Sequence, residues 1–345
     1  MGMSRSGRLL YAGLTLTMVA LVGLGFVAFV NRGGGSRPGG AAGADWPAPT
    51  GPATSTPATS PSGTAAPTSP AARPSGTPAA APGGKPGSAN TGVPLGTRPR
   101  VIRGDQTYTR DNQVIDGLDI HGFVRIAAKN VTIRNSIVRG GSPTCNSAVI
   151  RIDDDASATI LDSEVVASRP HPCLDGIWAT NARLIRLDIH GVVDGVKAYD
   201  NVLLQDSYVH DLSWFASDPN QDGEATHNDA VQTYEGNTNI VLRRNTLTVG
   251  REGNAAYQVT QDGGEAATNL RIEGNWLDGG GCTLNFAHKG GPTPMTGIYV
   301  IGNRFGRDSK FNCPILVSTQ TMLTEVSGNT WEDTGTPIPR PQRHD

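Results

Sequence analysis

The sequence has few aromatic residues and lacks the signatures of the common enzyme classes. Phe, Trp and Tyr make up 6% of its 345 residues. It has four cysteines but no Cys-x-x-Cys pair, which argues against a zinc site of the usual spacing. Serine-triad, P-loop and dinucleotide signatures are also missing from the sequence, so enzyme classes that depend on them have little support.

Acidic residues are nearly missing from the first 98 residues, which hold seven Lys and Arg residues and a single Asp. The remaining 247 residues carry 22 basic and 30 acidic side chains, a formal net charge of −8. An acidic domain binds nucleic acid poorly, so we expect no nucleic-acid partner. The net charge does not exclude neutral ligands, cations, or polyanions bound at a local basic region.

An uncharged apolar run occupies residues 9–30 and is long enough to span a bilayer as a helix. Arg5 and Arg8 precede it, which predicts a cytoplasmic segment at 1–8 and export of the rest. A cleaved signal peptide is the alternative. Residues 31–98 are almost entirely Gly, Pro, Ala, Ser and Thr, so we expect a disordered stalk. A folded domain at 99–345, expected to be a monomer, would then lie on the extracellular face of the plasma membrane or be secreted.

A strand-like unit repeats eight times in the second part of the chain, and each unit ends a hydrophobic run on Asn or Asp. Aligning the units places the following residues in one column: Asn135, Asp162, Asp188, Asp206, Asn245, Asn275, Asn303 and Asn329. Such short units cannot bury their own apolar faces, so they must stack on one another. The pattern predicts an all-β solenoid whose polar column forms a ladder.

These repeats, over roughly residues 100–335, resemble the right-handed parallel β-helix proteins of the pectate-lyase-like superfamily, whose coils carry a similar Asn ladder. The resemblance implies a right-handed parallel β-helix and leaves function open. Stacked strands lie about 4.8 Å apart, a spacing that suits a disulfide between equivalent positions of adjacent coils. We therefore predict the disulfides Cys145–Cys173 and Cys282–Cys313, which fit an exported protein.

Alternation along the first strand of each unit separates an inward row from an outward row. The inward row is Ile150, Ile177, Val196, Val231, Tyr257, Leu284 and Ile315. The outward face carries the predicted substrate-binding residues, which are Arg151, Trp178, Tyr199, Gln232, Tyr234, Gln258 and Asn285, together with Lys197. Aromatic rings stack on sugars and amides bind hydroxyls, so this surface suits an extended polysaccharide or cell-wall glycan.

One coil is much longer than the others, because 39 residues separate Asp206 from Asn245. The extra residues, 211–228, contain the calcium-loop pattern D-x-[DN]-x-[DN]-G. We therefore predict a calcium site, since hard cations need several oxygen ligands around one point. The predicted ligands are Asp218, Asn220, Asp222, Glu224, Thr226 and Asp229. A solvated turn is the alternative.

Three functions fit these residues, two of them catalytic. In β-helix polysaccharide lyases, calcium or a cationic side chain neutralises a uronate and a Lys or Arg removes the C5 proton; here Lys197 is the expected base. His227 is expected as a general acid or base, with Asp229 beside it. Hydrolysis by paired carboxylates is the second class, and a non-catalytic glycan-binding or adhesion module is the third. Asp175 and Asp194 either cap their own turns or join a site on the same edge.

Overall fold

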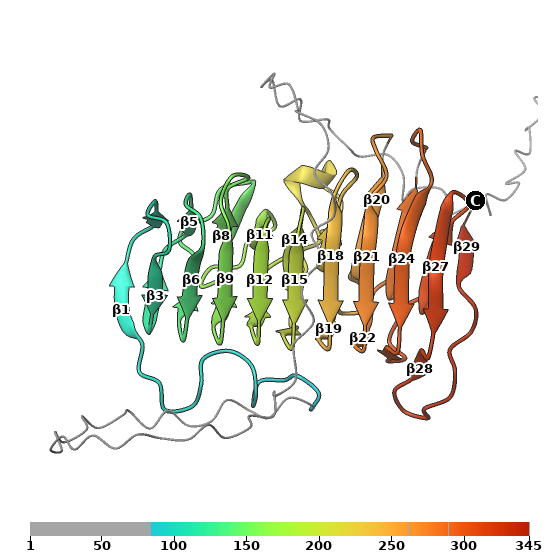
Figure 1. The fold of residues 1–345 in the computed structure, drawn as a ribbon, viewed down its shortest axis with the longest axis horizontal. Helices are drawn as coiled ribbons and strands as arrows, with labels where there is room; N and C mark the ends of the chain where they lie inside the picture. The colour runs from blue at the N-terminus through green and yellow to red at the C-terminus, as the bar shows by residue number, and fades with distance from the viewer. Residues whose placement is uncertain (1–83, 262, 289, 345) are drawn as a thin grey trace, which may run out of the picture. The chain divides into compact units, whose positions relative to one another are not determined.

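The computed structural model describes residues 84–261, 263–288 and 290–344. In that part of the chain the strands form three parallel sheets of ten, ten and nine strands, and each full coil contributes one strand to each sheet (Figure 1). The fold is an all-β parallel β-helix, which confirms the predicted solenoid. The predicted membrane segment 9–30 lies outside the described residues, and among the described ones no helix has the length and apolarity needed to cross a membrane.

The three sheets, named A, B and C, are defined by their strands in spatial order. Sheet A contains β1 (Arg100–Arg103), β4 (Leu118–His121), β7 (Ile137–Val138), β10 (Glu164–Val166), β13 (Asp188–His190), β16 (Tyr208–Val209), β19 (Thr246–Thr248), β22 (Trp276–Asp278), β25 (Arg304–Phe305) and β28 (Thr330–Trp331). Sheet B contains β2 (Gln106–Tyr108), β5 (Val124–Ile126), β8 (Ser147–Ile152), β11 (Leu174–Ala179), β14 (Val196–Ala198), β17 (Asp229–Thr233), β20 (Ala255–Gln261), β23 (Leu284–His288), β26 (Ile315–Ser318) and β29 (Gln342–His344). Sheet C contains β3 (Val114–Asp116), β6 (Val131–Arg134), β9 (Ala158–Leu161), β12 (Ala182–Ile185), β15 (Val202–Gln205), β18 (Thr238–Arg243), β21 (Thr268–Glu273), β24 (Met295–Ile301) and β27 (Thr321–Ser327).

The predicted inward row forms one column of the core on sheet B. Its members pair in the order Ile150, Ile177, Val196, Val231, Tyr257, Leu284 and Ile315, and all are buried. Tyr257 is the large polar exception, and its hydroxyl donates to Thr233 Oγ1 at 3.0 Å. The alternation of inward and outward side chains therefore fixes the strand register of sheet B, whose other face carries the outward row.

The predicted polar column is wrong as a single column, because it mixes two neighbouring positions of the turn from sheet C to sheet A. The first position has positive φ in every coil and is occupied by Asn135, Asp162, Arg186, Asp206, Arg244, Gly274, Gly302 and Gly328. The next position is buried and is occupied by Ser136, Ser163, Leu187, Ser207, Asn245, Asn275, Asn303 and Asn329. Asp188 belongs to neither position and begins β13. Asn and Asp tolerate the left-handed conformation of the first position, and Asn also occupies the second, so an alignment on Asn and Asp does not reveal the one-residue offset.

A true amide ladder fills the buried position in the last four units. Asn275 donates from Nδ2 to the Leu242 carbonyl at 2.8 Å and to Asn303 Oδ1 at 2.9 Å. Its own Oδ1 accepts from the backbone N–H of Asn245 at 2.8 Å. Each amide thus satisfies two backbone groups of the preceding coil, which would otherwise be buried without a partner.

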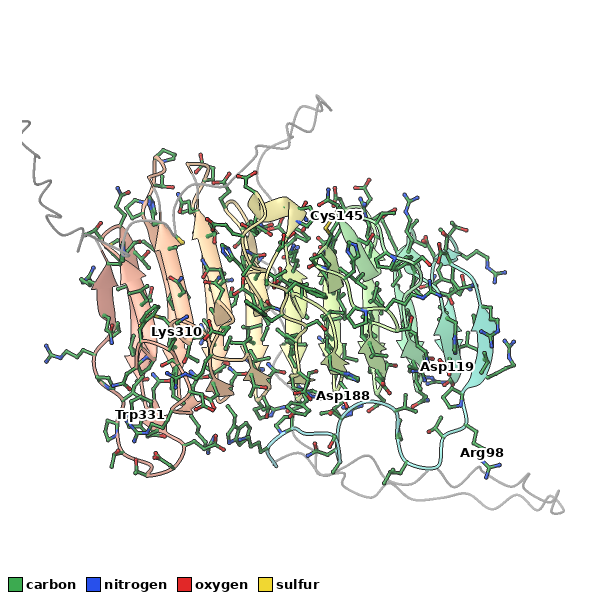
Figure 2. The ribbon with its side chains drawn as sticks, turned by 180° about the vertical axis from the view of Figure 1, so that it is seen from behind. Arg98, Asp119, Cys145, Asp188, Lys310 and Trp331 are labelled. Carbon is green, nitrogen blue, oxygen red and sulfur yellow. A yellow bond between two sulfur atoms is a disulfide. The ribbon has the colours of Figure 1, made fainter. Side chains whose placement is uncertain are left out.

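The last part of the predicted stalk packs on the β-helix. Residues 84–98, which we call the strap, lie along sheet A before the chain enters β1 (Figure 1). Lys85 pairs with Glu332 at 2.6 Å, and the Gly92 N–H donates to the Arg186 carbonyl at 2.9 Å. Figure 2 shows Asp188 beside this segment, and a Cβ at Gly92 would meet the Asp188 Cβ at 3.0 Å.

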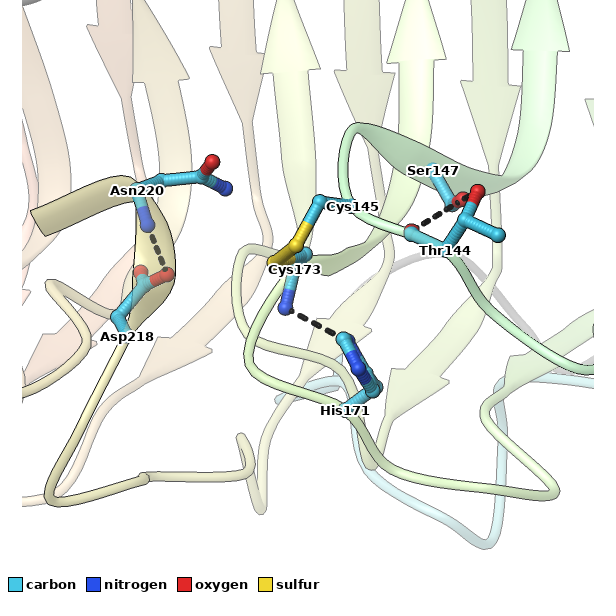
Figure 3. Close-up of a disulfide and its surroundings, with 7 residues drawn as sticks. All are labelled: Thr144, Cys145, Ser147, His171, Cys173, Asp218 and Asn220. Carbon is cyan, nitrogen blue, oxygen red and sulfur yellow. Dashed lines mark hydrogen bonds between the residues drawn. A yellow bond between two sulfur atoms is a disulfide. The ribbon is translucent and has the colours of Figure 1, made fainter. Parts of the chain in front are cut away.

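Both predicted disulfides are present. Cys145 bonds to Cys173, with Cα atoms 4.6 Å apart, and Cys282 bonds to Cys313, with Cα atoms 4.7 Å apart. Each disulfide connects the loops that lead from sheet A to sheet B in two adjacent coils. Figure 3 shows the Cys145–Cys173 bond. The two bonds indicate an oxidising environment, as in secreted or extracellular proteins.

Candidate functional site

The outer face of sheet B brings the predicted substrate-binding residues together. The outward row pairs in the order Arg151, Trp178, Lys197, Gln232, Gln258 and Asn285. Tyr199 and Tyr234, each placed directly beyond its strand, stack with ring centroids 6.2 Å apart. In parallel pairs, equivalent side chains of adjacent coils lie side by side, so these residues form one continuous strip along the axis of the β-helix.

A column of three aspartates borders this strip at the start of the sheet B strands. Asp175, Asp194 and Asp229 occupy equivalent places in three adjacent coils, because the Gly176 N–H donates to the Asp194 carbonyl and the Gly195 N–H donates to the Asp229 carbonyl. All three side chains are buried. Glycine follows the first two aspartates because a Cβ at Gly176 or Gly195 would collide with the backbone of the next coil. Close stacking of these turns therefore holds the carboxylates near one another.

Lys197 lies between two of these carboxylates. Its Nζ is 2.8 Å from Asp175 Oδ2 and 3.4 Å from Asp194 Oδ2, and its side chain is 19% exposed. Burial by itself would lower the pKa of Lys197, but the charges of Asp175 and Asp194 outweigh burial and raise that pKa well above its ordinary value. The ammonium is therefore protonated at neutral pH. This geometry supports Lys197 as a cation and does not support the free amine that the predicted base requires.

The two nearest carboxylates differ in their surroundings. Asp175 Oδ2 accepts from Trp178 Nε1 at 2.6 Å as well as from Lys197. Burial raises the pKa of Asp194 to about 7, with the attraction of Lys197 opposing burial and the charge of Asp175 adding to it. At neutral pH, Asp194 can therefore hold or release a proton while Asp175 accepts hydrogen bonds.

Tyr199 and Tyr234, beside the cluster formed by Lys197 and the aspartates, are hydrogen-bond donors at neutral pH. Burial is the main reason that the pKa of Tyr199 and of Tyr234 is raised. The Tyr234 hydroxyl donates to Gln232 Oε1 at 2.7 Å. The stacked rings and the oriented amide offer a flat apolar surface with fixed polar groups at its edge, which is the chemistry that sugar rings require.

A surface hollow of about 290 Å³ borders Trp178 on the side of the first coils. Trp178 and Arg151 line it together with Phe123 and Arg125. The Arg151 guanidinium lies 5.6 Å from the centroid of the Trp178 ring. Since Trp178 also donates to Asp175, one side chain connects the hollow with the carboxylates. A larger hollow of about 580 Å³ continues past Arg125 and Arg151 toward the turn after β8.

The loop that carries the calcium pattern is held by its own hydrogen bonds. Asp218 precedes the short 3-10 helix η1 (Pro219–Gln221), and its Oδ1 accepts from the Asn220 N–H at 2.8 Å (Figure 3). The Phe215 N–H donates to Thr226 Oγ1 at 2.9 Å, which closes the base of the loop. Asp222 and Glu224 are exposed.

The carboxylate of Asp229, the last predicted calcium ligand, accepts instead from Asn254 Nδ2 on the next coil, at 3.0 and 3.3 Å. Among the described residues, no group of three or more His, Cys, Asp or Glu side chains is arranged to hold a metal ion. The six predicted ligands do not converge in this arrangement, and calcium binding stays a prediction.

His227 and Asn254 show what the sequence could and could not reveal. His227 is exposed at the end of the long loop, and its role as a general acid or base stays a prediction. Asn254, which bonds to Asp229, has no signal in the sequence, since it lies in an ordinary turn before β20. For Asp175 and Asp194 the signal is the repeated Asp-Gly step before an apolar residue. Comparisons of this chain with protein-family models, with curated proteins and with solved structures found no match.

Proposed function

We propose that this protein is an extracellular, polysaccharide-active β-helix protein that hydrolyses glycosidic bonds with Asp194 and Asp175. The observation that carries the proposal is the single ammonium group of Lys197 between these two carboxylates, on the face that also presents the stacked tyrosines. A parallel β-helix is compatible with polysaccharide-active proteins. The proposal includes a right-handed coil, the hand adopted by nearly all parallel crossovers.

The two carboxyl groups would divide the chemistry of hydrolysis. Asp194 donates its proton to the glycosidic oxygen as the bond to the anomeric carbon breaks. Asp175 attacks that carbon as the nucleophile. Asp194 then takes a proton from the water molecule whose oxygen releases the sugar from Asp175, and Lys197 offsets the changes of charge on both groups. The sugar rings would lie on Tyr199 and Tyr234.

Elimination from a uronate is the second candidate, and the cations on the same strip favour it. Lys197 and Arg151 could neutralise a sugar carboxylate, which acidifies the neighbouring C–H bond. Because Lys197 is protonated, Asp175 would remove the C5 proton, and the leaving oxygen would take a proton from Asp194. Both reactions take a proton from Asp194 and use Asp175 as the second group, so their products distinguish them.

The experiment incubates the full-length protein with a panel of neutral and acidic polysaccharides, with and without calcium. New reducing ends and the ultraviolet absorbance of unsaturated uronates are followed together. Hydrolysis predicts reducing ends without absorbance, and elimination predicts both. Asp175→Asn and Asp194→Asn should abolish cleavage, whereas Asp119→Asn, which changes a largely buried carboxylate on sheet A outside the column, should not. Binding without cleavage by the wild type would instead indicate a glycan-binding or adhesion module.

We further propose that the N-terminal part of the chain attaches this domain to the outer surface of the cell. The two disulfides support an exported protein, and the apolar run at 9–30 supports an anchor. Treating intact cells with an external protease should release residues 84–345 if the run stays in the membrane. Recovery of the same domain from the medium without protease would favour secretion.

A further inference from the structure

The strap is fixed to sheet A at two places on either side of one coil. Thr246 Oγ1 donates to the Pro86 carbonyl at 2.8 Å, and the Gly92 N–H donates to the Arg186 carbonyl at 2.9 Å. Thr246 begins β19, and Arg186 lies two residues before β13. Strand β16 pairs with both of these strands. The strap therefore crosses the outer face of sheet A over the coil that contains β16.

Asp188 lies directly beneath the strap. A Cβ at Gly92 would meet the Asp188 Cβ at 3.0 Å and its Oδ2 at 3.6 Å. The other carboxylate oxygen, Oδ1, is 2.7 Å from His210 Nε2, and the side chains of Asp188 and His210 are only 15% and 13% exposed. Residues 86–97 of the strap carry no charged side chain. The strap therefore covers this carboxylate without neutralising it.

His210 faces a carboxylate with each of its two ring nitrogens. Its Nε2 is 2.7 Å from Asp188 Oδ1, and its Nδ1 is 2.8 Å from Asp211 Oδ2. A neutral imidazole has only one N–H group, so both contacts are hydrogen bonds only in the imidazolium form. Burial by itself would lower the pKa of His210, but the hydrogen bonds and charges of Asp188 and Asp211 outweigh burial and raise that pKa.

The other neighbours of His210 bring no further carboxylate to it and no permanent cation. The ring of Tyr208, on its own strand β16, stacks on the His210 ring with centroids 3.9 Å apart, and the His190 ring of β13 stacks at 5.1 Å. His190 Nε2 is 3.3 Å from Glu164 Oε1 on β10. Strand β19, on the opposite side, contains no charged residue. The imidazolium is therefore the charge that balances Asp188 under the strap.

We propose that His210 is a pH-dependent switch that holds the strap on sheet A as an imidazolium and releases the strap when the ring loses its proton. Without the imidazolium charge, Asp188 is an uncompensated anion beneath an uncharged cover, which is unfavourable. Asp211 is 87% exposed, so water replaces its contact with the ring. Asp188 gains water only when the strap leaves.

Release of the strap changes the reach of the β-helix. The strap has fifteen residues, 84–98, which span about 50 Å when fully extended. With the proposed attachment to the cell surface, release would let the β-helix reach polymer farther from the cell. This consequence rests on that attachment, whereas the switch itself does not depend on attachment or on catalysis.

The direction of the pH dependence follows from the raised pKa. The imidazolium contributes its full stabilisation below the pKa of a free histidine, about 6.5. That stabilisation is lost as pH rises through the raised pKa of folded His210. The strap should therefore be docked at acidic pH and released at alkaline pH.

Hydrogen exchange at the Gly92 amide of the full-length protein measures this docking. Rates at about pH 6 and about pH 9 are each divided by the rate of an unstructured peptide of the same sequence at the same pH. Protection of Gly92 should fall about tenfold or more between the two values. Nitrogen-15 spectra of the histidine rings follow the proton on His210. Unchanged protection after His210 has lost its proton would overturn the proposal.

Three variants separate the charge from the contact. His210→Gln, which is neutral at every pH, should leave Gly92 weakly protected at both values. Asp188→Asn leaves no charge under the strap, so Gly92 should stay protected at both. His121→Gln changes another histidine beside an aspartate on sheet A and should respond to pH like the wild type.

Two results with these variants would contradict the switch. A wild-type response to pH in Asp188→Asn would show that its charge is not the cause, and loss of the response in His121→Gln would place the cause elsewhere on sheet A. If His210→Gln does not fold, the comparison of the wild type with Asp188→Asn decides the question.

Discussion

Replacing Lys197 by Met should destabilise the folded protein strongly above neutral pH. Methionine keeps most of the apolar length of the side chain but removes the charge that neutralises Asp175 and Asp194. The side chains of these aspartates are only 8% and 7% exposed, so water cannot replace the ammonium. Removing one partner from a buried pair costs about 3–5 kcal/mol, and the partial exposure of Lys197 favours the lower end of that range.

Urea denaturation at about pH 8 measures this change in the free energy of unfolding. The triple variant Lys197→Met, Asp175→Asn, Asp194→Asn should recover much of the loss, since it leaves no unpaired charge behind. At low pH the single variant should lie closer to the wild type, because protonation of the aspartates removes the same repulsion. A loss below about 1 kcal/mol at pH 8, the value of a surface ion pair, would refute the argument from burial.

Three further changes test other parts of the account. Asn275→Ala removes the amide that hydrogen-bonds to the backbone of Asn245 and Leu242. It should lower the free energy of unfolding, measured in urea, by about 2–6 kcal/mol, because two buried backbone groups lose their partner. A loss below about 1 kcal/mol would contradict a stabilising role for the amide ladder. Gly92→Ala should loosen the strap, since Gly92 has φ +73° and faces the Cβ of Asp188; its amide should then exchange hydrogen faster, and an unchanged rate would contradict this docking. Cleavage should fall as pH rises through about 7, where Asp194 loses its proton. Lys197→Met should shift this fall in the pH–rate profile to higher pH, because the ammonium lowers the pKa of Asp194. A fall that stays at the same pH would show that another group causes it.

The stacked coils and the outward strip could be predicted because strand alternation is a local property. Ile177 and Trp178 point to opposite faces wherever β11 lies, and parallel stacking repeats that choice in each coil. The disulfides followed from the same register. The polar column could not be assigned as easily, because the left-handed turn residue and the buried residue after it both accept Asn. Only the pairing of Gln205 with Arg243 shows that Asp206 and Asn245 occupy different positions.

The candidate site was harder to predict, since its contacts join different coils. The sequence marks Lys197 as outward but does not show that Asp175, 22 residues earlier, lies 2.8 Å from its ammonium. The calcium pattern groups Asp229 with the loop residues by spacing alone, whereas the structure shows that its carboxyl group accepts from Asn254 on the next coil. The composition of the strap indicates a flexible segment. Its docking depends on contacts with sheet A, which composition alone does not reveal.

The most direct test of the central claim is the origin of the oxygen atom in the product. The wild type and Asp194→Asn are incubated in oxygen-18 water with a polymer that the wild type cleaves, and the fragments are analysed by mass spectrometry. Hydrolysis with Asp194 as the proton donor predicts label at the new reducing end and no fragments from the variant. Unlabelled, unsaturated fragments from the wild type, or equal cleavage by Asp194→Asn, would contradict the account.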